Sequence, residues 1–286
     1  VAHAGRHTAA ELVGGETPMA PSEIDADPRY NTVPREMSID DINSTIDAFG
    51  EAARRVKEAG FDAVQLHAAH GYLLAQFLSP HTNRRTDEWG GSPEKNAKFV
   101  IDVYKKTREV VGDNFPVLVK MNVAEGLPDG ITPEIACEAA KELAEHGIDA
   151  IEISGGTIVD TPLVMSRGDV PIDLFTTGLD PDVKAQMEEV FYSITSQVAF
   201  EEAYWLPFAE KIKPLIGETP LILVGGMKYP QTMEKILQDK KADFISMCRP
   251  LVREPNLPNE MAEGRKSPVR CAFCNKCLAM VMARSE

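Results

Sequence analysis

The sequence predicts an α/β protein with the architecture of a (β/α)8 barrel, or TIM barrel, here an incomplete one. Short apolar runs rich in β-forming residues alternate with longer helical runs, which is the pattern of a parallel sheet with crossover helices. The apolar runs lack a polar and apolar alternation, as expected for strands buried on both faces. A doubly wound sheet is the structural alternative, and it is disfavoured because no G-x-G-x-x-G motif follows any run.

The predicted elements account for most of the chain. The strands are residues 61–67, 116–122, 149–154, 220–224 and 242–247, and the helices are residues 40–59, 92–111, 132–146, 200–216 and 230–238. Residues 1–3 have the character of one further strand end. Because a barrel of this class needs eight strands to close, we expect the chain to correspond to about strands three to eight. We also expect it to bind a cofactor poorly and to aggregate when expressed without a preceding part.

Three helices have clear start signals. Ser38 or Asp40 can cap the first helix, and Ser92 with the acidic Glu94 opens the second. Pro230 suits the first turn of the last helix, because the missing N–H has no helical partner there in any case.

A long insertion separates the third strand from the next helix. Residues 155–199 are rich in Gly, Asp and Pro and become helical in character near residues 183–194. An insertion of this kind at the catalytic end of a barrel is typical of a lid or a substrate loop.

The charge balance restricts the partners of the chain. There are 30 Lys and Arg against 44 Asp and Glu, a net charge of −14. This excess of negative charge argues against binding to nucleic acid or to an anionic membrane, and favours a small molecule as partner. Five cysteines, with three of them crowded together, indicate a reducing compartment and hence a cytoplasmic location. Homo-oligomerisation is left open.

The polar residues that stand out fall at the predicted carboxyl ends of strands, where the active sites of barrels form. They are His3 and Arg6; His67, His70 and Tyr72; Lys120; Ser154, Gly155 and Gly156; Gly225 and Gly226; and Cys248 and Arg249. Their convergence predicts one functional site at that end of the barrel.

His67, His70 and Tyr72 are the candidate catalytic residues. Two neutral imidazoles can donate hydrogen bonds to one oxygen, which polarises a carbonyl and stabilises the negative charge that develops on it. A nearby phenol can supply a proton. One alternative is a pair of structural histidines. Another is a metal site, which is disfavoured because no carboxylate lies at a suitable spacing.

Gly225, Gly226 and Arg249 form a candidate phosphate site. Glycines allow a close approach of the backbone to a phosphate, and an arginine can bind the same group through two hydrogen bonds. Barrels commonly bind phosphate after their last two strands. The alternative interpretation is a tight turn with a surface arginine.

Cys271, Cys274 and Cys277 form a C-x2-C-x2-C motif. Three thiolates at this spacing can hold one corner of a [4Fe–4S] cluster. Zinc is an alternative that also needs a fourth donor, and cysteines can persist without any metal. We accordingly divide the chain into a barrel domain, residues 1–264, and a cysteine-rich segment, residues 265–286, as a candidate iron–sulfur site.

Five segments of the chain resemble the old yellow enzyme family. They are HAGR at 3–6, AAHGYLLAQFLSPHTNRRTDEWGGSPE at 68–94, EEAYWLPFAEKIK at 201–213, ILVGGM at 222–227 and DFISMCRPLVREPNLP at 243–258. They are most similar to the bacterial-type NADH:flavin oxidoreductases, the branch that includes 2,4-dienoyl-CoA reductase and trimethylamine dehydrogenase. The resemblance covers nearly the whole chain and implies an FMN-binding (β/α)8 barrel.

The resemblance also implies roles for individual residues. His67 and His70 resemble the pair that binds the carbonyl oxygen of the substrate, and Tyr72 resembles the proton-donating or pocket tyrosine. Arg249, with the backbone at Cys248 and Gly226, resembles the site of the FMN phosphate.

Three positions bear on how closely the family pattern is kept. Lys120 stands where the family usually has an arginine near the flavin N1 and C2 carbonyl; lysine keeps the charge and loses the planar fork. Cys248 stands where the family usually has a glycine beside the phosphate. The amine dehydrogenases of the family carry a tyrosine where this chain has His67, which favours carbonyl activation here.

These features predict an FMN-dependent oxidoreductase that uses NAD(P)H to reduce an activated alkene, such as an α,β-unsaturated carbonyl compound or an enoyl thioester. One alternative is a flavin-dependent dehydrogenase of an amine or another small donor, with electrons leaving through an iron–sulfur cluster. The other is a non-catalytic, truncated barrel.

Overall fold

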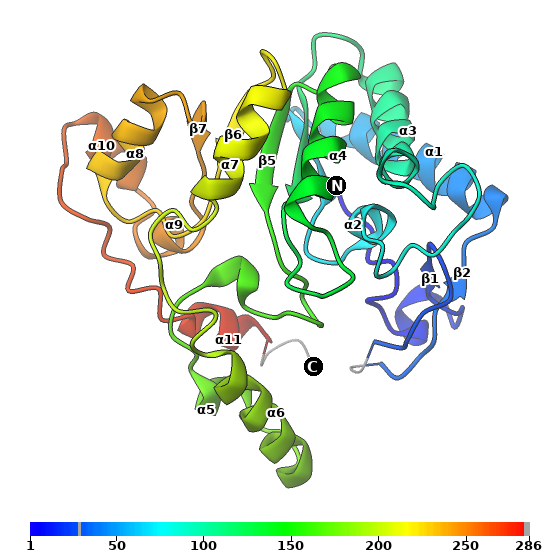
Figure 1. Ribbon diagram of the computed structural model, residues 1–286, viewed down its shortest axis with the longest axis horizontal. Helices are drawn as coiled ribbons and strands as arrows, with labels where there is room; N and C mark the ends of the chain where they lie inside the picture. The colour runs from blue at the N-terminus through cyan, green and yellow to red at the C-terminus, as the bar shows by residue number, and fades with distance from the viewer. Residues whose placement is uncertain (28–29, 283–286) are drawn as a thin grey trace.

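A computed structural model describes residues 1–27 and 30–282 (Figure 1). Its centre is a sheet of parallel strands in the order β3 (Val64–Ala68), β4 (Val117–Asn122), β5 (Ala150–Ser154), β6 (Leu221–Leu223) and β7 (Phe244–Ile245). A doubly wound sheet reverses its strand order at a switch point, and no reversal occurs here. The arrangement is therefore that of consecutive barrel strands, and the sheet formed by the described residues does not close.

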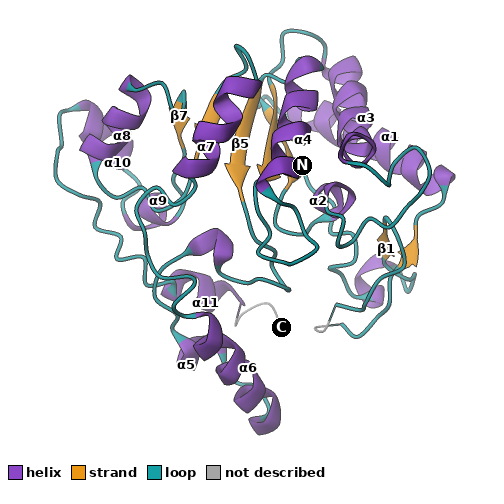
Figure 2. Cartoon of the chain, in the orientation of Figure 1, coloured by secondary structure: helices purple, strands orange, loops and turns teal. Residues whose placement is uncertain are grey.

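Helices connect the strands and cover the sheet as one layer (Figure 2). They are α1 (Ile39–Glu58), α3 (Pro93–Val111), α4 (Pro133–Glu145), α7 (Leu206–Ile212) and α8 (Pro230–Gln238). α1 contacts α3, α3 contacts α4, and α4 contacts α7, so successive crossovers lie side by side. No helix in the described part of the chain is long and apolar enough to cross a membrane.

Further elements complete the described chain. They are η1 (Ala10–Val13), β1 (Met19–Ala20), β2 (Arg35–Glu36), α2 (Leu73–Leu78), η2 (Val164–Ser166), α5 (Ile172–Phe175), α6 (Pro181–Ile194), η3 (Lys213–Leu215), α9 (Arg249–Arg253), α10 (Leu257–Ala262) and α11 (Lys276–Met282). β1 and β2 pair with each other in a separate parallel ladder.

Burial alternates along the first central strand. Val64, Leu66 and Ala68 are buried in the main core, whereas Gln65 and His67 point to the other face and are half-buried. Successive side chains of a strand point to opposite faces, so the helix-covered face takes the aliphatic residues and leaves the other face for polar ones.

The predicted helix starts agree with the structure at all three helices. Ser38, not Asp40, caps α1, because its Oγ accepts from the Asp41 N–H and the Asp41 carboxylate accepts from the Ser38 N–H. Ser92 caps α3 through its Oγ, which accepts from the Lys95 N–H. Pro230 occupies the first turn of α8.

The helix predicted at residues 200–216 is wrong at its start, since α7 begins only at Leu206. Ala203 has a φ of 54°, which no α-helix accommodates. The preceding Glu202 carboxylate accepts hydrogen bonds from the backbone of Tyr229 at 2.7 Å and from the Thr232 hydroxyl at 3.1 Å, so this segment is held as a turn against α8.

Residues 1–3 are not in a strand, yet Val1 pairs with β3 as a neighbouring strand would. The Val1 amino group donates to the Gln65 carbonyl at 2.7 Å, and the His67 N–H donates to the Val1 carbonyl at 3.0 Å. Two bonds to alternate residues of one partner are the pattern of a parallel ladder.

The insertion at residues 155–199 contains the predicted helix, as α6, and α5 beside it. Its small core of Leu163, Phe191 and Val198 is separate from the main core, and Leu278 of α11 packs against it. In Figure 1, α5 and α6 extend away from the sheet on the side to which β5 points. The insertion therefore stands at the carboxyl ends of the strands.

We predict that Leu66→Ala lowers the free energy of unfolding by about 2–5 kcal/mol, because Leu66 is fully buried and its loss leaves a cavity between sheet and helices. Leu12→Ala is the matched control: Leu12 is 76% exposed and its replacement should change stability by no more than about 0.5 kcal/mol. Urea denaturation of both variants measures the difference. Equal stability of the two variants would contradict this description of the core.

Candidate functional site

The register of the parallel strands places a histidine, a lysine and a glutamate side by side in one row. His67 of β3 is paired with Lys120 of β4, and Lys120 is paired with Glu152 of β5. Paired residues of neighbouring strands share a face of the sheet. The row therefore lies on the face opposite the helices.

The histidines and the tyrosine of the site lie together, as predicted. The rings of His67 and His70 have centroids 5.0 Å apart, and those of His67 and Tyr72 are 5.3 Å apart. His70 Nε2 is 2.7 Å from the Ser154 hydroxyl at the end of β5. Two imidazoles and a phenol thus form one cluster at the strand ends.

The backbone of His70 is held in an uncommon conformation. Its φ is 61°, in the left-handed region that is uncommon for residues other than glycine. Its N–H donates to the Asn122 side chain at 3.1 Å, and its carbonyl accepts from the Ile158 N–H at 3.1 Å. Contacts from two other strand ends therefore fix the position of this residue.

Both histidines are kept neutral at ordinary pH. Burial, followed by the positive charge of Lys120, lowers the pKa of His67 to about 4. Burial lowers the pKa of His70 to about 3, with smaller effects of His67 and Lys120 in the same direction. Neutral imidazoles can each offer one N–H as a donor, which is the state that carbonyl polarisation needs.

Lys120 is paired with a buried carboxylate that sequence reasoning missed. Its Nζ lies 3.1 Å from Glu152 Oε1, and Gln65 Nε2 donates to Glu152 Oε2 at 2.9 Å. Glu152 is only 5% exposed. A charged residue inside the apolar run AIEIS was the available signal, because a carboxylate is rarely buried unless it is paired.

A cavity of about 380 Å³ lies beside this row. Its lining includes most of the predicted cofactor and catalytic residues, namely His70, Lys120, Gly225, Gly226, Cys248 and Arg249. His67 and Tyr72 do not line this cavity; the His67 ring contacts that of His70, which does, and the Tyr72 ring contacts that of His67. The volume falls within the roughly 300–1,000 Å³ of ligand pockets. Two cationic side chains in its wall suit an anionic, phosphate-bearing cofactor such as FMN.

The glycine pair after β6 is required by packing. Gly225 and Gly226 have φ values of 111° and 66°. A Cβ on Gly226 would lie 2.2 Å from the Glu201 carbonyl oxygen, and one on Gly225 would lie 2.8 Å from the Trp205 ring. The tight turn is thus explained by the segment packed against it, and the phosphate role of this turn stays a prediction.

Arg249 lies at the cavity wall but is already engaged on one side. Its Nη1 donates to the carbonyls of Ser166 at 3.2 Å and Arg167 at 3.0 Å. The side chain of Asn275 accepts from the same nitrogen at 2.5 Å. The arginine therefore touches the insertion and the cysteine-rich segment, which the sequence did not predict.

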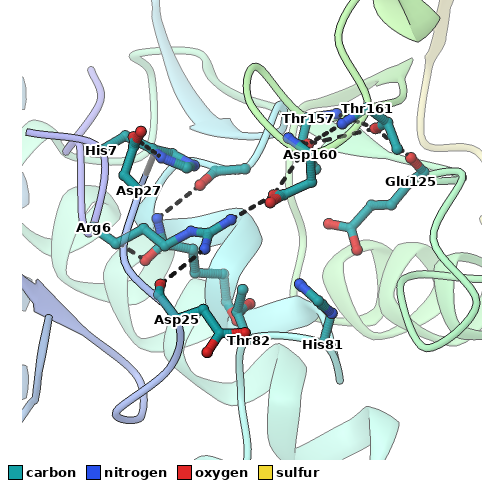
Figure 3. A network of polar contacts seen from close by, with 12 residues as sticks. Arg6, His7, Asp25, Asp27, His81, Thr82, Glu125, Thr157, Asp160 and Thr161 are labelled. Atoms are coloured by element: carbon teal, nitrogen blue, oxygen red, sulfur yellow. Dashed lines mark hydrogen bonds and ion pairs between the residues drawn. The ribbon is translucent and has the colours of Figure 1, made fainter. Parts of the chain in front are cut away.

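A network of polar contacts joins the N-terminal segment to the root of the insertion (Figure 3). Arg6 Nη2 is 2.5 Å from Asp160 Oδ2, and the Asp160 N–H donates to the Thr157 hydroxyl at 2.9 Å. In the same view, His7 and Asp27 form a buried pair at 2.8 Å. The sequence predicts Arg6 as a residue of the site, but it does not predict its partner Asp160.

Glu125 lies next to this network and is almost fully buried. Burial raises the pKa of its carboxyl group, although the Ser79 hydroxyl and the Ile131 N–H both donate to it, at 2.5 Å and 2.9 Å. These bonds fasten the loop after β4, so we assign Glu125 a structural role.

The cysteine motif does not form a metal site as placed. Cys271 and Cys274 are half-buried and Cys277 is exposed at the cavity wall. Across residues 1–27 and 30–282, no three His, Cys, Asp or Glu side chains are grouped so that they could hold a metal ion. The three cysteines as arranged here do not form a site for a [4Fe–4S] cluster. Binding of such a cluster by this motif stays a prediction.

We predict that the rings of His67 and His70 remain neutral down to about pH 5, well below the ordinary histidine pKa. Since the unfolded chain takes up these protons near pH 6.5 and the folded chain only near pH 4 and pH 3, the free energy of unfolding falls as the pH decreases from 6.5 toward 4. Ring ¹⁵N NMR titration and urea denaturation at several pH values measure both effects.

The variant His67→Gln/His70→Asn removes both groups and keeps a residue that tolerates left-handed backbone at position 70. Its stability should depend less on pH over this range. A histidine of the pair that titrates near pH 6.5 in the folded protein would contradict the assignment.

Comparisons with known proteins agree with this geometry. The chain is 34% identical over 274 residues to an NADH oxidase from Thermoanaerobacter brockii; the match covers 96% of this chain and 37% of that protein. It is 28% identical to the structure of a 2-naphthoyl-CoA reductase in complex with 2-naphthoyl-CoA, with a TM-score of 0.77, over 96% of this chain and 39% of that chain. It is 26% identical to histamine dehydrogenase from Rhizobium sp. 4-9, with a TM-score of 0.78, over 98% and 37%.

The chain thus spans less than two fifths of the length of each of these three proteins. The solved structures similar to it are TIM-barrel members of the old yellow enzyme family, which confirms the predicted fold class. Residues 1–176 match the sequence profile of a family of enzymes described as NADH:flavin oxidoreductase / NADH oxidase. The chain belongs to the NADH:flavin oxidoreductase / NADH oxidase family.

Proposed function

We propose that the chain is the FMN-binding catalytic part of an oxidoreductase that uses NAD(P)H to reduce an activated alkene. The substrate class is an α,β-unsaturated carbonyl compound or an enoyl thioester. The observation that carries the proposal is the cluster of His67, His70 and Tyr72, in which burial lowers both histidine pKa values far below neutrality. Neutral paired donors suit a carbonyl oxygen better than they suit an anion.

In this proposal His67 and His70 bind the carbonyl oxygen of the substrate. Each imidazole donates one N–H, and these bonds strengthen as negative charge moves onto the oxygen in the transition state. Ser154, 2.7 Å from His70 Nε2, orients that ring. Because the pair carries no charge of its own, it does not attract carboxylates or phosphates to this position.

Tyr72 supplies the proton. FMN, when bound, supplies hydride transfer between NAD(P)H and the alkene. The β-carbon receives the hydride and the α-carbon receives the proton of the Tyr72 hydroxyl, so that the C=C bond becomes a C–C single bond. A proton from solvent restores the phenol.

We assign the cofactor to the cavity beside this cluster. Arg249 and the backbone at Gly225, Gly226 and Cys248 would hold the phosphate, and Lys120 would face the ring system. The size of the cavity and its two cationic residues support this assignment. Residues 1–264 would form the cofactor domain, residues 155–199 its lid, and residues 265–286 a cysteine-rich wall.

Oxidation of an amine or another small donor is the second candidate function. The likeness to histamine dehydrogenase favours it, and so does the presence of Cys277 in the wall of the cavity. Turnover of histamine and simple amines with an artificial electron acceptor, compared with turnover of cyclohexenone with NADH or NADPH, separates the two functions. If the purified protein showed no flavin absorbance, neither enzymatic function would be supported, and the third interpretation, a non-catalytic barrel, would remain.

We predict that His67→Ala/His70→Ala lowers the rate of cyclohexenone reduction about 100-fold or more, since loss of one such donor typically costs about 3 kcal/mol of transition-state stabilisation. The amount of bound flavin, read from its visible absorbance, should stay the same. His146→Ala is the matched control, because His146 is exposed at the end of α4. Unchanged turnover in the double variant would refute the role of the histidine pair.

A further inference from the structure

Asn275 is a buried and hydrogen-bonded side chain of the cysteine-rich segment. It is only 1% exposed and its φ is 56°, a left-handed conformation that asparagine tolerates better than most residues. A buried amide needs partners for both its oxygen and its nitrogen. The hydrogen-bond partners of Asn275 show which segments of the chain it connects.

The Asn275 amide connects two segments that are distant in the sequence. Its Nδ2 donates to the Ser166 carbonyl at 2.8 Å and to the Asp169 carbonyl at 3.0 Å, both in the insertion. Its Oδ1 accepts from Arg249 Nη1 at 2.5 Å. One side chain thus fastens the insertion and the arginine at the end of β7 to the cysteine-rich segment.

Asn275 and its neighbours use only one edge of the Arg249 guanidinium. The three hydrogen bonds of Arg249 to Ser166, Arg167 and Asn275 all come from Nη1, and the Tyr204 hydroxyl is a further neighbour of the guanidinium. The Phe273 ring lies against the guanidinium, 5.1 Å from centroid to Cζ, and limits its rotation. Nε and Nη2 form the opposite edge, and two parallel N–H donors on one edge are the geometry that binds a phosphate.

We propose that Asn275 is a positioning residue that presents the Nε and Nη2 edge of Arg249 to the phosphate of the cofactor, and so makes the site prefer FMN to riboflavin. The inference rests on the proposed function, in which Arg249 holds that phosphate. Ser166, Arg249 and Phe273 all line the cavity, so the wall that Asn275 organises is the wall of the cofactor site.

The chemistry of the amide explains why asparagine is used at this position. Aspartate would keep the acceptor for Arg249 but lose both bonds to the insertion, and its charge would compete with the phosphate for the guanidinium. Glycine would keep the left-handed backbone and lose all three bonds. These two changes therefore separate the side chain from the backbone conformation.

The test compares dissociation constants for FMN and riboflavin, which differ by the phosphate alone, in the purified protein that carries this chain. Equilibrium dialysis measures both ligands. We expect Asn275→Gly to raise the dissociation constant for FMN about tenfold and to leave that for riboflavin within about twofold, because a charged hydrogen bond to phosphate is worth that much. Asn275→Asp, which keeps both size and backbone preference, should have the same selective effect.

Two further variants serve as controls. Arg249→Ala should raise the dissociation constant for FMN more than Asn275→Gly does, and the double variant should bind FMN no more weakly than Arg249→Ala alone, because the two residues act as one unit. Val269→Ala loosens the same C-terminal segment at a buried residue that does not line the cavity, and it should leave the ratio of the FMN and riboflavin dissociation constants unchanged.

Three results would overturn the inference. Equal weakening of FMN and riboflavin by both Asn275 variants would make the residue merely structural. An unchanged FMN dissociation constant would remove its role altogether. If the unaltered protein bound FMN no more tightly than riboflavin, Arg249 would not hold a phosphate, and the cofactor assignment of the proposed function would fail as well.

Discussion

The parallel register of β3, β4 and β5 is the constraint on which the site depends. It places His67, Lys120 and Glu152 in one row on the face that the helices leave open. The side-chain period of a strand is two, so a slip of β4 by one residue would turn Lys120 under the helices and bring Val119 or Met121 into the row. The packing of aliphatic side chains under the helices therefore also determines which polar side chains lie on the opposite face of the sheet.

The row of His67, Lys120 and Glu152 contains an ion pair next to an uncharged histidine. Glu152 accepts a hydrogen bond from Gln65 and forms an ion pair with Lys120, so the lysine is not left as an unpaired buried charge. Lys120 still acts on the histidine pair, where it adds to the dominant effect of burial in lowering both pKa values. A buried ion pair and two uncharged imidazoles thus coexist over adjacent strands.

Segments outside the barrel repeat build the rest of the site. The root of the insertion is fixed from one side by the Arg6 and Asp160 ion pair and from the other by Asn275. Close to these points, the Ile158 N–H donates to the His70 carbonyl, and the Ser166 carbonyl accepts from Arg249. The insertion, which varies in length most easily in such a fold, is therefore tied to both the catalytic cluster and the arginine.

Features that depend on residues close together in the chain could be predicted from the sequence alone. Short apolar runs between helical runs indicated the parallel strands, Ser38 and Ser92 indicated two helix starts, and the position of His67, His70 and Tyr72 after a strand indicated the cluster. The tertiary structure decided what depends on residues far apart in the chain: the pairing of Lys120 with Glu152, and the contact of Arg249 with Asn275. These pairs have no spacing signal, because strand register and loop packing bring them together only after the chain has folded.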